Sequence, residues 1–220
     1  VEPPKRYFGS LASLKSIQSF AKTDLTYLFK SITIVAVSVL LVFYVGMEMY
    51  AEIDKGIRLP EKYASSGLMA NAISENFYLF GLLILVYFIN DLFWRSHTSG
   101  FDWIEKSTYF SKNKLKGHFV SISILISFFT LLLMAEGLLF QFSYGYPTID
   151  WNAYLGVVVF NMFPLILFAA SLLLINDRIG SRFVGLGVST LVVFVLATPL
   201  LKMILPYPLF QIFSGFKGVY

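Results

Sequence analysis

The chain has 220 residues, of which 57% are hydrophobic and only 14% are charged, and its formal net charge is +4. Soluble domains carry about 25% charged residues, so this composition excludes an ordinary soluble domain. Cysteine is absent, which excludes disulfides and thiolate metal sites, and a small positive charge in so apolar a chain does not indicate a nucleic-acid partner.

Five apolar runs, each close to the length that crosses a lipid bilayer, fill most of the sequence. A hydrocarbon core of roughly 30 Å takes about 20 helical residues. Because backbone polar groups cannot stay unpaired in lipid, these runs predict helices and therefore an all-α integral membrane protein. The predicted spans are residues 31–50, 76–94, 119–142, 154–176 and 183–201.

The first predicted element, over residues 7–30, is an amphipathic helix. Apolar residues recur there every three or four positions, while Lys15, Lys22 and several Ser and Thr residues occupy the other faces. A basic amphipathic helix that precedes a span typically lies along the lipid headgroups, as an elbow helix does. The alternative is a simple extension of the first span into water. The apolar positions are Leu11, Leu14, Ile17, Ala21, Leu25 and Leu28.

Lys and Arg residues are distributed unevenly between the two sides of the predicted bundle. Twelve of the 17 precede the first span, follow the second span or follow the fourth. Cytoplasmic loops carry the excess of basic residues in membrane proteins, so this bias predicts a cytoplasmic N-terminus. The connections 51–72 and 144–151 are then external, and the connection 96–117 lies in the cytoplasm.

The cytoplasmic connection after the second span contains a predicted short helix over residues 100–110. A run of Ser, Thr and Gly breaks the preceding helix, and Phe101, Ile104 and Glu105 then share one helical face. A short helix rich in exposed aromatic residues is typical of a surface that docks a soluble partner. The alternative is an interfacial helix whose Phe and Trp side chains contact lipid. The residues predicted for this contact are Gly100, Phe101, Asp102, Trp103, Ile104, Glu105 and Tyr109.

Four polar or helix-breaking residues inside the predicted spans are candidate sites. Glu136 lies in an apolar run and is a candidate for intramembrane chemistry, but it lies roughly 27 Å from the start of its span, near the outer headgroups, where a structural role is the alternative. Asn161 precedes Pro164 by three residues on the same face and is a candidate for pairing with a neighbouring helix. Pro164 and Pro199 each remove a helical hydrogen bond, which predicts kinks that serve either packing or transport.

Motifs for catalysis are missing from the sequence. It contains no GxxxxGK[ST] phosphate loop, no HExxH pair and no GxSxG nucleophile turn, so the chain is predicted not to be an enzyme. The only histidines, His97 and His118, are far apart and have no cysteine or patterned carboxylate beside them. This spacing predicts neither a zinc site nor any other cofactor in the chain.

Short stretches of the sequence resemble one branch of membrane transporters. Asp91-Leu-Phe-Trp94-Arg95 stands where large bacterial proteins that fuse ABC permease halves to a zinc aminopeptidase-like domain carry Glu-Leu-Val-Trp-Arg. Asp102-Trp-Ile104 and Gly117-His-Phe119 stand at the next two motifs of that family, and residues 174–184 are similar to a fourth. The order of elbow helix, two spans, cytoplasmic coupling helix and further spans likewise resembles a type-2 ABC exporter permease.

This resemblance implies a permease segment of an exporter in a bacterial cytoplasmic membrane, driven by ATP and magnesium on a separate ABC ATPase subunit. The predicted helix over 100–110 would contact that ATPase, and the other partners would be lipid and a second permease half or a second copy of the chain. Such permeases have six spans per half. A sixth span is therefore expected beyond residue 220, after an outer interfacial segment over 206–220. The alternative is the membrane scaffold of a fused aminopeptidase-like protein, without transport.

Overall fold

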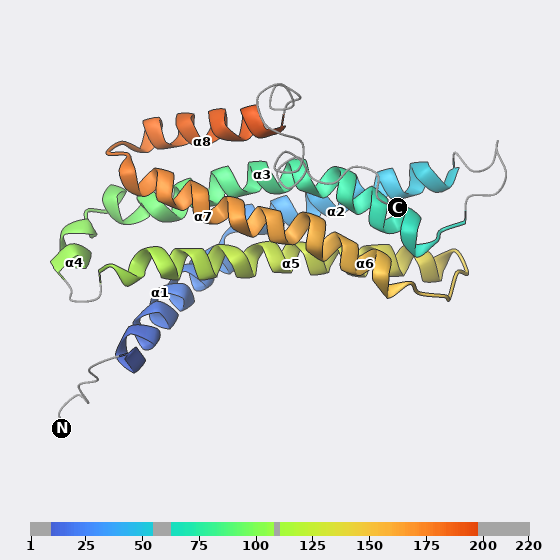
Figure 1. The fold of residues 1–220 in the computed structure, drawn as a ribbon, viewed down its shortest axis with the longest axis horizontal. Helices are drawn as coiled ribbons and strands as arrows, with labels where there is room; N and C mark the ends of the chain where they lie inside the picture. The colour runs from blue at the N-terminus through green and yellow to red at the C-terminus, as the bar shows by residue number, and fades with distance from the viewer. Residues whose placement is uncertain (1–9, 55–62, 108–110, 198–220) are drawn as a thin grey trace.

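The computed structural model describes residues 10–54, 63–107 and 111–197, and every regular element in these ranges is a helix. The predicted all-α class is therefore confirmed for this part of the chain. Figure 1 shows long helices lying side by side along the molecule, with one short helix at an end of the bundle. The elements are α1 (Ser10–Lys30), α2 (Ile32–Asp54), α3 (Ser66–Thr98), α4 (Asp102–Ser107), α5 (Asn113–Ser143), α6 (Trp151–Val157), the π-helical turn η2 (Val158–Met162), α7 (Phe163–Arg178) and α8 (Arg182–Ala197).

Four helices are long and apolar enough to cross a membrane, which makes the chain a multi-pass membrane protein. They are α2, α3, α5 and the continuous helix formed by α6, η2 and α7, and they cover the first four predicted spans. The fifth predicted span corresponds to α8, which is apolar but has only 16 residues in the described part of the chain. The end of that predicted span, 198–201, and the predicted outer segment, 206–220, lie outside the described residues.

The spanning helices are longer than the apolar runs that predicted them. α3 begins at Ser66, inside the predicted 51–72 connection, because the Ser65 hydroxyl accepts a hydrogen bond from the Leu68 amide and caps the helix. α5 begins at Asn113, six residues before the predicted span, since the polar residues there continue the helix. Hydropathy marks only the part of a helix that suits lipid, whereas capping decides where the helix ends.

α1 is a separate helix that packs obliquely against α5 (Figure 1). Leu11 and Leu14 of the predicted apolar stripe are 67% and 61% exposed and so remain available to lipid. The two helices approach closely at Gly117 of α5, where a Cβ atom would lie 2.5 Å from the Cβ of Phe20. The predicted position of α1 along the headgroups stays a prediction. Its packed face consists of Ala12, Ala21, Asp24 and Leu28.

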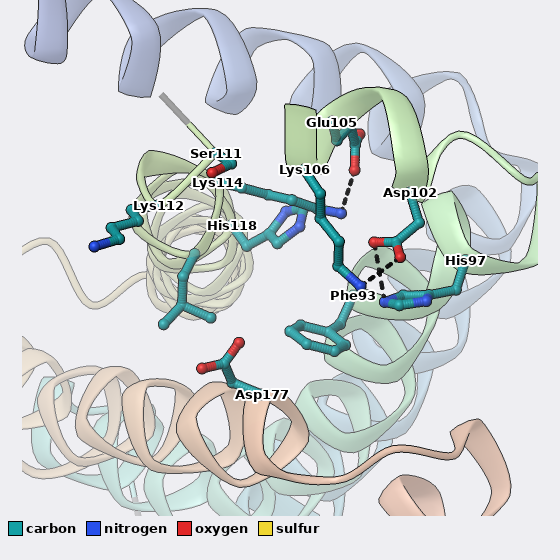
Figure 2. A pocket seen from close by; sticks show the side chains of 11 residues that line it. Phe93, His97, Asp102, Glu105, Lys106, Ser111, Lys112, Lys114, His118 and Asp177 are labelled. Carbon is teal, nitrogen blue, oxygen red and sulfur yellow. Dashed lines mark hydrogen bonds and ion pairs between the residues drawn. The ribbon is translucent and has the colours of Figure 1, made fainter. Parts of the chain in front are cut away.

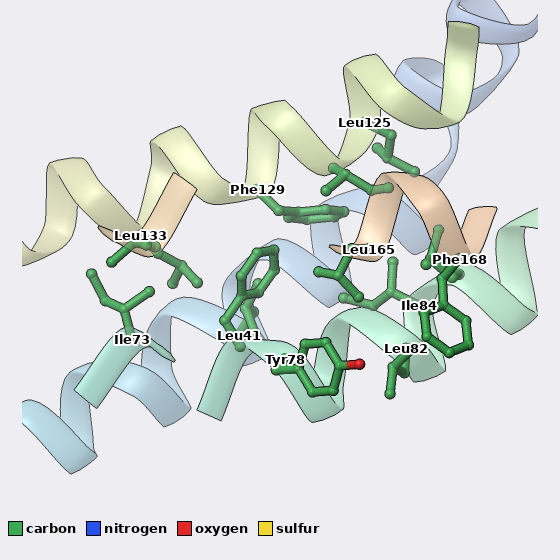
Figure 3. Close-up of a cluster of buried hydrophobic side chains, with 14 of the residues drawn as sticks. Leu41, Ile73, Tyr78, Leu82, Ile84, Leu125, Phe129, Leu133, Leu165 and Phe168 are labelled. Carbon is green, nitrogen blue, oxygen red and sulfur yellow. The ribbon is translucent and has the colours of Figure 1, made fainter. Parts of the chain in front are cut away.

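The core is a continuous set of apolar side chains from α2, α3, α5 and α7 (Figure 3). Phe129 and Leu133 of α5 are fully buried there, as is Leu165 of α7. Gly81 of α3 lets α7 approach, because a Cβ atom at this position would lie 2.5 Å from a methyl group of Leu165. Helices in lipid associate through such close van der Waals packing, since the surrounding lipid tails are as apolar as the helices.

Candidate functional site at the α4 end of the bundle

Side-chain ion pairs gather at the end of the bundle where α3 stops and α5 starts. We call it the α4 end, because α4 joins the two spans there (Figure 1). The chain reverses sharply after α3: the Ser99 amide donates to the carbonyl of Arg95 at 3.0 Å, and Gly100 has a φ of +75°. That left-handed conformation favours glycine, so the predicted break at Gly100 has a physical cause.

Large apolar side chains are exposed on and beside α4. Among the described residues the helix covers Asp102–Ser107 and so begins two residues after the predicted start at Gly100; the predicted end, 108–110 with Tyr109, lies outside the described residues. Phe101, Trp103 and Ile104 are 58%, 82% and 61% exposed. An apolar surface of this kind beside a polar cluster marks a contact for another molecule.

Ion pairs attach α4 to both neighbouring spans (Figure 2). Oδ1 of Asp102 lies 3.3 Å from Nε2 of His97, which belongs to α3. Oδ2 of Asp102 lies 2.7 Å from Nζ of Lys106 within α4. Lys114 of α5 donates to the Glu105 carboxylate of α4 and to the Ser96 hydroxyl of α3. The short helix is therefore held at a defined position between α3 and α5.

Acid is expected to loosen this attachment through Asp102. Burial raises the pKa of Asp102, but the hydrogen bond from Lys106 and the charges of His97 and the nearby lysines outweigh burial and hold the pKa below its usual value of 3.8. A carboxylate with a lowered pKa stabilises the fold above its unfolded pKa, and that contribution is lost as the pH falls through the folded value. A spin label at Ser107→Cys should be restricted at pH 7 and become mobile below pH 3.8.

In the same label background, Asp102→Asn should make the label mobile already at pH 7, because the amide cannot replace the charge. Equal label mobility in the two proteins at pH 7 would show that Asp102 does not hold α4.

The second group of interactions is the buried Asp24 cluster, formed by Asp24, Arg95, His118 and Ser121. Asp24 of α1 is 2% exposed; its Oδ1 accepts from Arg95 of α3 at 3.2 Å, and its Oδ2 lies 2.5 Å from Nδ1 of His118 of α5. The Ser121 hydroxyl also donates to Asp24, at 3.4 Å. A buried carboxylate persists only when it is paired and hydrogen-bonded. The Asp24 cluster therefore fastens α1 to α3 and α5 together.

Trp94, the neighbour of Arg95, connects α3 to α7 and α8. Its indole N–H donates to Oδ1 of Asn176 at 3.1 Å, and the Asn176 amide donates to the hydroxyl of Ser189 at 3.1 Å. All three residues are buried. Gly185 of α8 permits this contact, because a Cβ atom there would lie 2.6 Å from the Asn176 oxygen.

Asp91 completes the set of predicted motif residues. Its carboxylate accepts from the Tyr27 hydroxyl of α1 at 2.9 Å and lies 4.0 Å from the guanidinium of Arg182 at the start of α8. Burial and the hydrogen bond to Asp91 raise the pKa of Tyr27 above its usual value, so the phenol stays protonated and donates. Asp91, Trp94 and Arg95 thus contact three other helices, α1, α7 and α8, from one stretch of α3.

Asp24 was not among the residues predicted for the site. The sequence does contain a signal for it, since Asp24 follows Ala21 by three residues and precedes Leu28 by four, on the face that packs. A carboxylate on the packed face of an amphipathic helix indicates a buried partner. The partners, Arg95 and His118, are distant in sequence and have no local pattern that reveals them.

Glu136, which is predicted to lie near the outer headgroups, packs against α2. One carboxylate oxygen lies 2.5 Å from the position that a Cβ atom on Gly46 of α2 would occupy. Its Oε2 is buried and has no hydrogen-bond partner among the described residues. The headgroup position came from helix rise alone, which gives a depth but not the direction in which a side chain points.

Asn161 and Pro164 lie together where the fourth span changes its helical geometry. The Asn161 amide donates to the Ser74 hydroxyl of α3 at 2.9 Å, which is a contact with a neighbouring helix. Asn161 belongs to η2, and Pro164 follows as the second residue of α7. Proline cannot donate the usual helical hydrogen bond, and a widened turn is one way for the preceding residues to accommodate it. Pro199 lies outside the described residues.

Metal ligands do not gather anywhere in the described ranges, where no group of three His, Cys, Asp or Glu side chains has suitable geometry. His97 faces Asp102 and His118 faces Asp24, so the two histidines serve separate ion pairs. Comparison with protein-family models, curated proteins and solved structures finds no match for this chain. The resemblance to ABC exporter permeases therefore stays a prediction that rests on the motifs quoted above.

Proposed function

We propose that the chain is a permease segment of an ATP-driven exporter and that α4 docks a separate ABC ATPase subunit in the cytoplasm. The observation that supports this best is the exposure of Phe101, Trp103 and Ile104 on a short helix held by ion pairs to two spans. Interfaces use exposed aromatic and large aliphatic side chains as anchors. A bacterial cytoplasmic membrane and a second permease half or second copy belong to the same proposal.

The attachments of α4 suit it for passing on a mechanical displacement. Asp102 pairs with His97 at the end of α3, and Glu105 pairs with Lys114 at the start of α5. Beyond them, Arg95 leads to α1 and Trp94 leads to α7. A partner that moves α4 on binding or hydrolysing ATP would shift these helices as a packed group, which is how rigid-body transitions switch a bundle between two arrangements.

The proposal predicts that Phe101→Ala with Ile104→Ala weakens the ATPase contact at least thirty-fold. Anchors at the centre of an interface typically contribute about 2 kcal/mol or more each, and 1.4 kcal/mol corresponds to a factor of ten in affinity. Both side chains are exposed in the chain alone, so folding should be unchanged. The measurement is co-purification and ATPase activity with a co-expressed ATP-binding subunit.

The matched control is Leu11→Ala with Leu14→Ala, which removes two equally exposed apolar side chains from α1. This control should keep the ATPase contact. Full partner binding and ATPase activity in the α4 double variant would contradict the docking role and leave α4 as a lipid contact.

The proposed orientation predicts opposite labelling at the two ends of the bundle. The chain has no cysteine, so Ser107→Cys at the end of α4 and Thr148→Cys between α5 and α6 each introduce a single thiol at an exposed position. A membrane-impermeant maleimide added to intact cells should label Thr148→Cys and spare Ser107→Cys, because the excess of Lys and Arg faces the cytoplasm. Both thiols should react after permeabilisation, and the reverse pattern in intact cells would overturn the orientation.

A further inference from the structure

A cavity of about 370 Å³ lies at the α4 end between α3, α4, α5 and α7 (Figure 2). The proposed ATPase contact uses the exposed side of α4, whereas this cavity lies on the side that faces the bundle. Its volume is within the range of small-molecule sites in proteins. Residues that matter for its chemistry are Lys106, Lys112, Lys114, Asp102, Glu105 and Asp177.

Two charged side chains at the cavity have no ion-pair partner among the described residues. Lys106 pairs with Asp102 and Lys114 pairs with Glu105, whereas Lys112, the residue before α5, is exposed and has no ion-pair partner among the described residues. The same is true, within those residues, of Asp177 of α7, which Figure 2 shows pointing toward the space in front of α5. The mouth of the cavity therefore has one exposed cation, just before α5, and one exposed anion, on α7.

A third polar group at the cavity lacks a partner. His118 lines the wall and is 3% exposed, and its Nε2 atom is buried with no hydrogen-bond partner in the described part of the chain. Buried polar atoms in folded proteins are nearly always hydrogen-bonded to protein, to water or to a ligand. His118 thus gives the cavity a polar wall, with its Nε2 atom just beneath the surface.

An apolar groove continues from the cavity along α5 and α7. It has a volume of about 200 Å³ and is lined by Leu115, Phe119, Ala170, Leu173 and Leu174, together with Lys116. Leu115 lines both spaces, so the polar cavity and the apolar groove adjoin. Lys116 lies one helical turn from Lys112 on α5 and places a second ammonium group near the junction.

We propose that this composite site binds an aminophospholipid, with the polar head in the cavity and one acyl chain in the groove. The phosphate would lie at Lys112 and Lys116, and the primary ammonium of the head would pair with Asp177. Basic pockets between membrane helices bind lipid phosphates, and Lys stems line apolar surface while their charged ends reach polar groups. This inference does not depend on ATPase docking.

Charge complementarity favours an aminophospholipid over a purely anionic lipid. A head with a phosphate but no ammonium would place its negative charge near the Asp177 carboxylate, which is unfavourable. A soluble phosphate ester with an amine would satisfy the same charges but leave the groove empty. The number of chains and the charge of the head are thus separate, testable properties of the ligand.

The test titrates the purified full chain in detergent with phosphatidylethanolamine, with phosphatidylglycerol of the same chains, and with soluble O-phosphoethanolamine, and measures bound ligand by native mass spectrometry. Phosphatidylethanolamine should bind tightest. Lys112→Ala and Asp177→Asn should each weaken the binding of phosphatidylethanolamine at least tenfold. Asp177→Asn should leave the binding of phosphatidylglycerol unchanged or stronger. Ala170→Phe fills the groove, so in this variant phosphatidylethanolamine should bind no more tightly than O-phosphoethanolamine.

Lys22→Ala on α1, away from the cavity, is the control and should bind lipid as the unaltered chain does. Lys112 and Asp177 are exposed and make no ion pair or side-chain hydrogen bond with other described residues, so their variants should keep the melting temperature of the parent. Unchanged phosphatidylethanolamine binding in Lys112→Ala and Asp177→Asn would overturn the site. Tighter binding of phosphatidylglycerol would overturn the ammonium contact, and equally tight O-phosphoethanolamine would overturn the acyl-chain contact.

Discussion

Replacing Asp24 by alanine is expected to lower the free energy of unfolding by about 3 kcal/mol and to release α1 from the bundle. Removing this carboxylate leaves Arg95 and His118 without their buried counter-charge, at a position where Asp24 itself is 2% exposed. The loss lies at the lower end for a broken buried pair, because the Arg95 side chain is 31% exposed and partly hydrated.

Two measurements check this expectation: the unfolding transition of the purified protein, and the distance between spin labels at Gln18→Cys on α1 and Val120→Cys on α5. Asp24→Ala should lower the transition and broaden the distance distribution. Thr23→Ala, at the exposed neighbouring position, should change neither. A narrow, unaltered distance in Asp24→Ala would mean that apolar packing alone holds α1.

The second large effect is expected at Trp94. Trp94→Ala should cost about 3–5 kcal/mol, because it opens a cavity at a side chain that is 5% exposed. Trp94→Phe retains most of the ring volume but removes the N–H that reaches Asn176, so it should cost about 1–3 kcal/mol through the unsatisfied buried oxygen. The difference between the two losses in unfolding free energy separates the contribution of packing from that of the hydrogen bond.

The readout specific to this site is the exposure of α8. Val193 of α8 is 4% exposed, so a thiol at Val193→Cys should react slowly in the parent chain and faster once Trp94→Ala loosens the contact with Asn176. Trp151→Ala removes an equally large side chain that is 63% exposed and should leave the thiol protected. A protected thiol in Trp94→Ala would show that α8 docks without Trp94.

The sequence predicted which segments form spanning helices better than it predicted where the helices end or how many spans there are. Apolar length alone predicts a spanning helix, and α2, α3 and α5 each contain the run that predicted them. Helix ends depend on single hydrogen bonds, and so the start of α3 at Ser66 escaped a prediction based on hydropathy. α8 remains below the length of a span within the described residues.

The site residues likewise differ in whether their contacts come from nearby or from distant parts of the sequence. The reversal at Gly100 and the exposed Phe101 and Trp103 are local properties, and hence were predictable. The partners of Asp24 come from α3 and α5, far along the chain, and only the packing of three helices brings them together. Glu136 shows the same limit, because its own span predicts only a depth, whereas its neighbour Gly46 comes from another helix.

The length of α3 sets the height of α4 above the bilayer. With 33 residues, α3 is about 50 Å long, which exceeds a hydrocarbon core of roughly 30 Å. Asp91, with its ionic partners, is too polar for the core, and the seven residues from there to Thr98 add roughly 10 Å of helix, about the depth of a headgroup layer. In the proposed arrangement this length places Trp103 at the aqueous edge of the membrane, where a soluble protein could reach it without displacing lipid.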